Sequence, residues 1–368
     1  MKIIYKFLII SFIITIIKTI DINEYKPVIG IYGNSYPDTD FIYANQTVYA
    51  GSNIRFLESH GAETMAIHQW YSEKELDEIL SKVNGVLFIG GSRDFNLSAK
   101  WEKNALYIIN KAKKNGLPIW GTCQGFQLII SLIANDASII KKEYSHLSVL
   151  DKINKEDLKN SKIFNLFDEK SLNILFNNNS ILFDHSFGLS EKDYNENQLL
   201  KNDLVISTYA NDSKGKKFAN TFEPKNQSIN IFGSQFHPES MPFIRSPKWN
   251  IENENNVLRM NMLIGSFIVE LGRKNKNKFE MKDREKYDFF DLYSNSTKYW
   301  LYDSTYNQYY FKKNNNTDDD DEKNKINGLL IFIYFIVGIF IISILIFIFI
   351  KCIPLLKRDE DDDNYNTV

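Results

Sequence analysis

Uninterrupted apolar runs alternate, in the first third of the chain, with segments in which apolar residues recur at helical spacing. The apolar runs, which predict buried strands, are residues 26–32, 63–67, 85–89 and 117–120. The segments at helical spacing are residues 46–60, 73–82, 99–115 and 126–134. Buried strands separated by helices are typical of a parallel sheet that is covered on both faces. Ligands bind such sheets beyond the carboxyl ends of the strands, so a site is expected at that edge.

The pattern weakens and then returns in the second half of the chain. Residues 150–202 are rich in Asn and Lys and show no clear period. Strand-like runs follow at residues 204–209, 218–223 and 230–236, and a long amphipathic helix is predicted at 252–274. The aromatic segment that ends at residue 311 predicts one or two further strands that return to the same domain.

Both ends of the chain carry apolar segments of the kind that engage membranes. Residues 1–20 begin with lysines and continue as an uncharged apolar core, which predicts a secretory signal peptide. Residues 328–350 carry no charge and would be about 34 Å long as a helix, enough to cross a bilayer. We therefore predict a catalytic domain at 24–311, a polar acidic stalk at 312–327, the membrane helix, and a cytoplasmic tail at 351–368.

This order of segments predicts a single-pass type I membrane protein. Its catalytic domain would be lumenal or extracellular, in a lysosome or vacuole or at the cell surface. Sequons such as those at Asn96 and Asn211 agree with a glycoprotein. Because residues 1–20 end in a poor cleavage site, retention of this segment as an anchor stays open.

Composition limits which partners are predicted and whether a disulfide can form. The net charge is −2 and there is no basic excess, so nucleic acid is not a predicted partner. Of the two cysteines, Cys123 and Cys352, only Cys123 precedes the predicted membrane helix, so no disulfide can form within the lumenal part. A lone thiol in an oxidising compartment is expected to be either buried or used.

The segment around Cys123 has the pattern of a nucleophile elbow. The apolar run at 117–120 leads into Gly121-Thr122-Cys123-Gln124-Gly125, and an apolar helix is predicted directly afterwards. Small residues allow the sharp strand-to-helix turn that lifts a nucleophile above the sheet. The helix N-terminus then aims its amide groups at the sulfur, where they can hold a developing oxyanion.

A second candidate element is the sequence Gln235-Phe236-His237-Pro238-Glu239 at the end of a predicted strand. Residues two apart on a strand point the same way, so His237 and Glu239 can stand side by side. The three side chains would then act in sequence: Cys123 attacks a carbonyl, His237 moves the proton, and Glu239 orients the imidazole. The backbone amides of Gly91 and Gln124 are the predicted oxyanion donors.

Each element also has an ordinary structural explanation. A buried cysteine is usually a small hydrophobic residue, and His-Pro-Glu by itself is a weak tripeptide. It is their joint position at strand ends of one sheet that favours catalysis. The sequence shows no further His or Cys at ligand spacing, so no metal site is predicted.

The segments 121–127 and 235–239, together with Gly90-Gly91-Ser92, resemble the class I glutamine amidotransferase-like superfamily, and within it the γ-glutamyl hydrolases. The sequence His185-Ser186-Phe187-Gly188-Leu189-Ser190 supports that branch, because the family carries a functionally important histidine there. The resemblance spans roughly residues 25–311. It implies a three-layer α/β/α, flavodoxin-like sheet. Gln124 departs from the leucine that is common in the family.

The resemblance also implies an activity and roles for individual residues. Cys123 would be the nucleophile, His237 the base and Glu239 its orienting acid, while His185 would lie at the substrate site. The implied substrate is folylpoly-γ-glutamate, cleaved through a γ-glutamyl thioester without a cofactor, and the enzyme could be a homodimer. Two alternatives stay open: a hydrolase of another γ-glutamyl amide, and a non-catalytic, membrane-anchored binding protein on the same scaffold.

Overall fold

The structure is a computed structural model of the chain, and it describes residues 26–35, 46–155, 158, 160–242, 253–287 and 308–312. All of them fall within one compact unit, Met1–Lys313. The predicted signal peptide, the membrane helix, the tail and nearly all of the stalk lie outside the described residues. Among the helices that are described, none combines the length and the apolar character needed to cross a bilayer.

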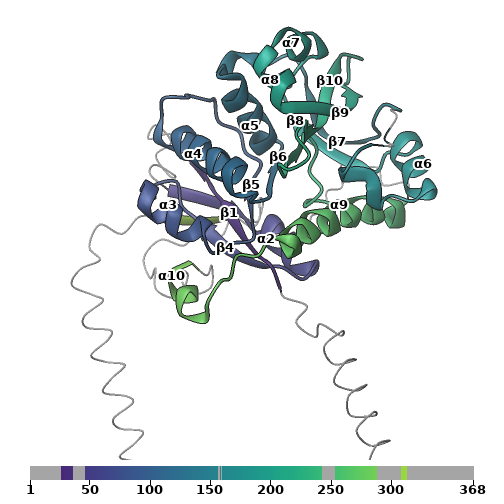
Figure 1. Cartoon of the computed structure of the whole chain (residues 1–368). Coiled ribbons are helices and arrows are strands. Elements are labelled where there is room, and N and C mark those ends of the chain that lie inside the picture. Colours follow the sequence, from purple (N-terminus) through teal and green to yellow (C-terminus); the bar gives the residue numbers. More distant parts are fainter. Residues whose placement is uncertain are drawn as a thin grey trace, which may run out of the picture. The chain divides into compact units, whose positions relative to one another are not determined.

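The described elements alternate between strands and helices through most of the unit (Figure 1). The strands are β1 (Val28–Tyr32), β2 (Asn34–Ser35), β3 (Gln46–Ala50), β4 (Glu63–Ile67), β5 (Gly85–Phe88), β6 (Ile119–Thr122), β7 (His146–Asp151), β8 (Ile181–His185), β9 (Leu204–Asn211), β10 (Lys217–Pro224), β11 (Ile231–Ser234) and β12 (Gln308–Lys312). The α-helices are α2 (Gly51–Ser59), α3 (Glu73–Leu80), α4 (Lys100–Asn115), α5 (Gln124–Ala134), α6 (Glu169–Asn177), α7 (Glu191–Glu196), α8 (Gln198–Asp203), α9 (Glu254–Lys274) and α10 (Arg284–Tyr287).

The main sheet has seven strands in the order β4-β1-β5-β6-β11-β10-β9. The strands from β4 to β11 run parallel, whereas β10 pairs antiparallel with both β11 and β9. The parallel sheet predicted from the strands in the first third of the chain is confirmed, and the antiparallel strands β10 and β9 extend it at one edge. The five residues between β9 and β10, with Gly215 at φ +79°, form a short turn, and such a turn joins only antiparallel neighbours.

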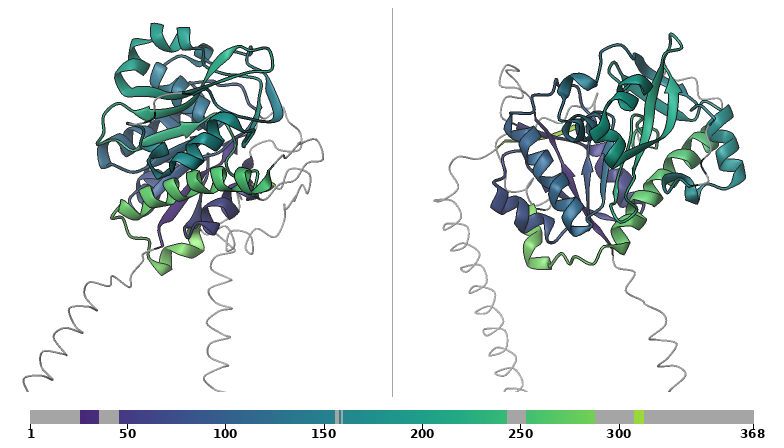
Figure 2. Two further views of the ribbon diagram at one scale, coloured as in Figure 1. Left: turned by 90° about the vertical axis from the view of Figure 1, so that its right-hand side faces the viewer. Right: turned by 45° about the horizontal axis from the view of Figure 1, so that its top comes forward.

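The sheet lies between two layers of helices (Figure 2), and its strands are apolar on both faces. On β1, Val28 and Tyr32 face a core shared with α3, α4 and α5. Ile29 and Ile31, between them, face a second core shared with α2 and α9. Side chains that alternate between two buried faces explain why the strands appear in the sequence as uninterrupted apolar runs.

The predicted helix at 46–60 is only half helical. Its first part, Gln46–Ala50, is strand β3, which pairs antiparallel with β2 and with β12. Thr47, Val48 and Tyr49 are β-branched or aromatic, and these residue types favour a strand once partners are present. The partners come from distant parts of the chain, so the apolar spacing alone could not separate the two conformations.

The region 150–202 has more structure than its irregular pattern indicated. It contains α6, α7, most of α8, and β8, which pairs antiparallel with β7. The two helices α6 and α7 begin at side-chain caps: Asp168 accepts a hydrogen bond from Ser171, and Ser190 accepts one from Asp193. Caps of this kind define short helices that have too few turns to show a period.

Helix α5 approaches the sheet at two glycines. A methyl group at Gly125 would overlap the backbone carbonyl of Phe88 in β5, lying 2.6 Å from its carbon. A methyl group at Gly121 would lie 2.8 Å from the backbone of Gly125. These contacts bring the first turn of α5 against the ends of β5 and β6, where the candidate nucleophile lies.

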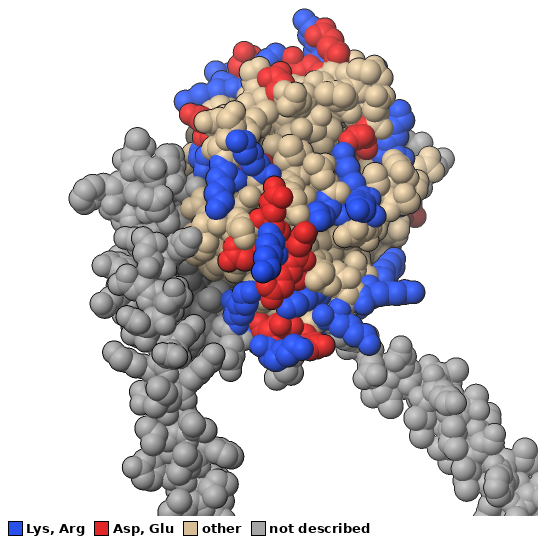
Figure 3. All heavy atoms as spheres, turned by 60° about the vertical axis from the view of Figure 1, so that its left-hand side comes forward, with Lys and Arg blue, Asp and Glu red and all other residues tan. Residues whose placement is uncertain are grey.

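Charged side chains are interspersed on the face shown in Figure 3, where lysines and arginines lie beside acidic residues. Ion pairs join helices of the unit: Lys111 pairs with Asp77 at 2.7 Å, and Lys286 pairs with Glu78 at 2.8 Å. Mixed charges of this kind produce no extended positive field for a polyanion on this face.

We predict that Gly125→Ala destabilises the protein by about 3 kcal/mol, because the clash is with backbone that cannot turn away. The matched control is Gly116→Ala, at the C-terminus of α4. Gly116 has a φ of +67° and open space around its Cα, so only backbone strain of roughly 1 kcal/mol is expected there. Urea unfolding of the two variants measures the difference, and equal losses would contradict the close approach.

Candidate active site

Cys123 occupies the sharp turn between β6 and α5. Its backbone has φ +50° and ψ −105°, a conformation that residues other than glycine rarely adopt. The turn is held by the Cys123 N–H, which donates to the carbonyl oxygen of Ser234 in the neighbouring strand at 2.8 Å. Strained backbone of this kind costs about 1–3 kcal/mol, and it persists only where the surroundings impose it.

His237 lies next to Cys123 across Gly90. A methyl group built on Gly90 would lie 2.8 Å from Cε1 of His237 and 3.5 Å from Cβ of Cys123. His237 follows β11, and its N–H donates to the Leu182 carbonyl of β8 at 2.9 Å. The ends of β5, β6 and β11 thus bring together Gly90, Cys123 and His237, as the sequence predicts.

Glu239 holds the other side of the His237 ring. Its Oε1 is 2.8 Å from Nδ1 of His237, so Nδ1 carries a proton and donates it to the carboxylate. Burial lowers the pKa of His237, but the thiolate of Cys123 and the carboxylate of Glu239 outweigh this effect and hold that pKa well above its usual range. The arrangement therefore favours the imidazolium form of His237.

His185 lies at the end of β8, and its pKa is shifted in the opposite direction to that of His237. Its Nδ1 is 3.0 Å from the carbonyl oxygen of Phe187, which can only accept, so Nδ1 carries the proton. Burial, with smaller contributions from His146 and His237, lowers the pKa of His185 to about 3, and the ring is neutral. Its Nε2 is buried and has no hydrogen-bond partner in the described part of the chain. The ring therefore offers one acceptor for an incoming N–H group.

The predicted oxyanion donors lie at the same edge. Cys123 is the N-cap of α5 and makes no side-chain cap, so the first amides of that helix stay open. Neither Gly91 nor Gln124 donates its amide N–H to a partner among the described residues. The side chain of Gln124 lies against Gly91, and its Nε2 donates to the carbonyl oxygen of Arg93 at 2.7 Å. Its backbone amide thus stays available despite the departure from leucine.

Sequence reasoning missed two buried glutamines beneath the site. Nε2 of Gln127 lies 2.9 Å from the carbonyl oxygen of Phe187 and 3.0 Å from Oε1 of Gln235. Gln127 thereby holds the same carbonyl that orients His185. The signal that could have found it is spacing, because Gln127 follows Cys123 by one helical turn. Gln235 stands in the segment 235–239 that carries the family resemblance, but no spacing rule assigns it a role.

We predict that Glu239→Gln lowers the pKa of His237 by about one unit or more, because a nearby carboxylate stabilises the imidazolium. The imidazolium would then be lost at lower pH, so the alkaline limit of activity moves to lower pH. Titration of the histidine ring resonances by NMR measures the shift.

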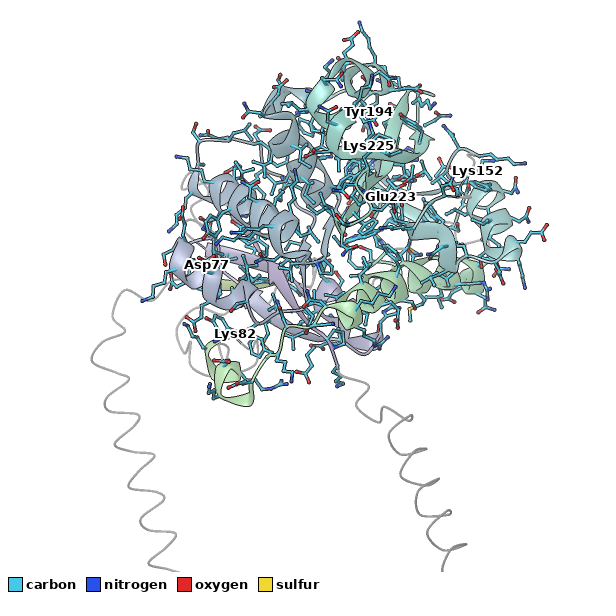
Figure 4. The ribbon with its side chains drawn as sticks, in the orientation of Figure 1. Asp77, Lys82, Lys152, Tyr194, Glu223 and Lys225 are labelled. Carbon is cyan, nitrogen blue, oxygen red and sulfur yellow. The ribbon has the colours of Figure 1, made fainter. Side chains whose placement is uncertain are left out.

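The matched control is Glu223→Gln, another buried carboxylate in the same unit. Glu223, labelled in Figure 4, lies near the end of β10 and accepts a hydrogen bond from the Lys162 N–H at 2.7 Å. In the sheet it pairs with Val205 of β9, and its neighbour Phe222 pairs with Gly233 of β11, so it lies away from the edge that carries His237. A His237 pKa that is unchanged in Glu239→Gln, or equally lowered in Glu223→Gln, would contradict the assignment.

Comparison with known proteins identifies the family. The family model for glutamine amidotransferase class-I matches residues 48–250. The chain is 27% identical to gamma-glutamyl hydrolase B of Dictyostelium discoideum over 73% of this chain and 78% of that protein. It is 28% identical to gamma-glutamyl hydrolase of Rattus norvegicus, over 73% of this chain and 86% of that protein.

A solved structure, the glutaminase domain of Trypanosoma brucei CTPS with bound acivicin, aligns at 13% identity and a TM-score of 0.43, over 70% of this chain and 99% of that one. The family match covers Gly90, Cys123, His185 and His237, and with them both sides of the site. The chain belongs to the class I glutamine amidotransferase family, and its domain has the α/β fold of that family.

Proposed function

We propose that this protein hydrolyses the γ-glutamyl bonds of folylpoly-γ-glutamates through a γ-glutamyl thioester on Cys123. The observation that carries the proposal is the pairing of Cys123 with His237, whose pKa is raised, at one edge of the sheet. The names of the relatives support the γ-glutamyl bond as the target, since relatives from several organisms are gamma-glutamyl hydrolases.

In the first half of the reaction, the thiol proton of Cys123 passes to His237, and Sγ attacks the γ-carbonyl carbon. The π electrons move onto the carbonyl oxygen, which the N–H groups of Gly91 and Gln124 stabilise as an oxyanion. As the oxyanion collapses, the C–N bond breaks and His237 gives its proton to the leaving amine. The products of this half are a thioester on Cys123, a free amine and a neutral His237.

In the second half, water replaces the amine. His237 removes a proton from the water, whose oxygen attacks the thioester carbon. Collapse of this second oxyanion breaks the C–S bond and releases a γ-carboxylic acid, which gives its proton to the solvent. The proton on His237 then returns to the sulfur of Cys123. Glu239 holds the ring in the same orientation throughout, through its contact with Nδ1.

His185 suits recognition of the substrate rather than proton transfer. A ring with a pKa of about 3 stays neutral across the working range, so it does not compete with His237 for the catalytic proton. Its open Nε2 accepts an N–H from an amide of the substrate, such as the γ-glutamyl amide that is cleaved. The buried position makes that hydrogen bond stronger than it would be in water.

We predict that Cys123→Ala lowers the cleavage of pteroyl-polyglutamate by at least about a thousandfold, because no thioester can form. Chromatography of the shortened folates measures the rate. The matched control is Ser131→Ala, another fully buried position on α5 whose hydroxyl has no partner among the described residues. That variant is expected to retain wild-type turnover.

The same assay separates the alternatives. Equal turnover by wild type and Cys123→Ala would overturn the mechanism. Cleavage of other γ-glutamyl amides, without cleavage of pteroyl-polyglutamate, would favour a hydrolase of different specificity. Binding of the folate without any turnover would favour the non-catalytic binding protein.

We further propose that the catalytic unit is lumenal or extracellular and tethered by the predicted helix at 328–350. The charge-free length of that segment supports this proposal, as does the signal-like segment at 1–20. A lysosome or vacuole, or the cell surface, would be the location. The homodimer stays a prediction that sizing of the purified unit would test.

We predict that deletion of residues 328–368 moves the enzyme from the membrane pellet to the soluble or secreted fraction, since the apolar segment would be lost. Carbonate extraction followed by an activity assay measures the partition. Full-length protein that is released by carbonate would contradict the tether, whatever its activity.

A further inference from the structure

The segment that follows β5 is held in place by two side-chain amides from different elements. Asn34, in β2, donates from Nδ2 to the carbonyl oxygen of Gly90. Gln124, in α5, donates from Nε2 to the carbonyl oxygen of Arg93. Gly91 lies between the two side chains, so closely that a methyl group there would overlap both. The backbone that carries one predicted oxyanion donor is therefore held from both sides.

The bond from Asn34 determines how the Gly90–Gly91 peptide is oriented. A trans peptide is planar, and its C=O and N–H groups point in opposite directions. Because Asn34 holds the Gly90 oxygen, the Gly91 N–H faces away from Asn34. Gly90 itself lies against His237 and Cys123, so this peptide borders the catalytic pair.

A peptide between two glycines would otherwise rotate easily. Neither residue has a Cβ, so each adopts both signs of φ at little cost. Rotation of the peptide plane would exchange the positions of the Gly91 N–H and the Gly90 oxygen. The carbonyl dipole would then oppose the oxyanion instead of stabilising it. Asn34 is the side chain that prevents this exchange.

The surroundings of Asn34 indicate a role other than stabilising the fold. Its side chain is 6% exposed, and its Oδ1 is buried with no partner among the described residues. A buried oxygen without a partner is unfavourable, and an apolar residue at this position would avoid that cost. The Nδ2 group offers what an apolar residue cannot, a donor directed at the Gly90 carbonyl.

We propose that Asn34 is a positioning residue for the oxyanion site: it locks the Gly90–Gly91 peptide with the N–H of Gly91 available to the substrate oxygen. This inference rests on the proposed function, in which Gly91 stabilises the oxyanion. Asn34 itself does not touch the substrate.

The test compares Asn34→Ala with Asn34→Asp. Alanine removes the donor, and aspartate replaces it with an acceptor that repels the Gly90 oxygen and attracts the Gly91 N–H. The expected loss in kcat for pteroyl-polyglutamate is about tenfold for alanine and about a hundredfold or more for aspartate, with KM changed by less than about threefold. Asn104→Ala is the matched control, because Asn104 is also buried and donates to two backbone carbonyls, those of Gln69 and Tyr71.

A second measurement separates positioning from a general loss of structure. Alkylation of Cys123 by iodoacetamide passes through no oxyanion, so its rate should stay within about twofold of wild type in both Asn34 variants. Acylation of Cys123 by p-nitrophenyl acetate does form an oxyanion, and its rate should fall in step with kcat.

The acetate ester also distinguishes the two proposals. If the wild type cleaves no γ-glutamyl amide, the proposed function fails, while the ratio of acylation to alkylation still tests Asn34. The inference would be overturned if the ratio of acylation rate to alkylation rate stays within about twofold of wild type in both Asn34→Ala and Asn34→Asp. Equal falls in alkylation and acylation would also overturn it, since they would indicate damage to the thiol site as a whole.

Discussion

The left-handed backbone of Cys123 is the constraint on which the rest of the site depends. A cysteine keeps φ at +50° only because the structure around it leaves no relaxed alternative. The Ser234 carbonyl holds its N–H, and Gly125 lies against the Phe88 carbonyl, so the turn is compressed between three strands. The same strained turn places the open first amides of α5 beside the sulfur. The backbone strain therefore accompanies a partial positive charge at the thiol.

Two histidines share this site and are held in opposite charge states. Both are largely buried, and burial by itself lowers the pKa of each. At His237 the contributions of Cys123 and Glu239 reverse the effect. At His185 the raising contributions come from the backbone carbonyls of Phe187 and Tyr144, and burial outweighs them. One ring is therefore able to carry the catalytic proton, and the other stays a neutral acceptor. The assignment of roles follows from the neighbours of each ring and not from its type.

Side-chain amides hold much of the remaining geometry. Gln127 fixes the carbonyl that orients His185, and Gln124 fixes the loop after β5. Gln124 replaces the leucine that is common in the family without closing the helix N-terminus, because its backbone amide stays open. Its side chain forms a structural hydrogen bond to the Arg93 carbonyl instead. A polar layer of this kind positions catalytic groups without adding charges that would disturb their pKa values.

The sequence by itself determined the alternation of buried strands and helices, the elbow at Cys123, and the edge at which His237 and Glu239 meet it. These features depend on local periodicity and on turn chemistry, and residues that are close together in the sequence determine both. Tertiary structure decided the antiparallel strands β9 and β10, the strand β3 within a helix-like segment, and the amide contacts of Gln127 and Asn34. Those outcomes depend on which distant partners supply hydrogen bonds, and no local pattern in the chain encodes that choice.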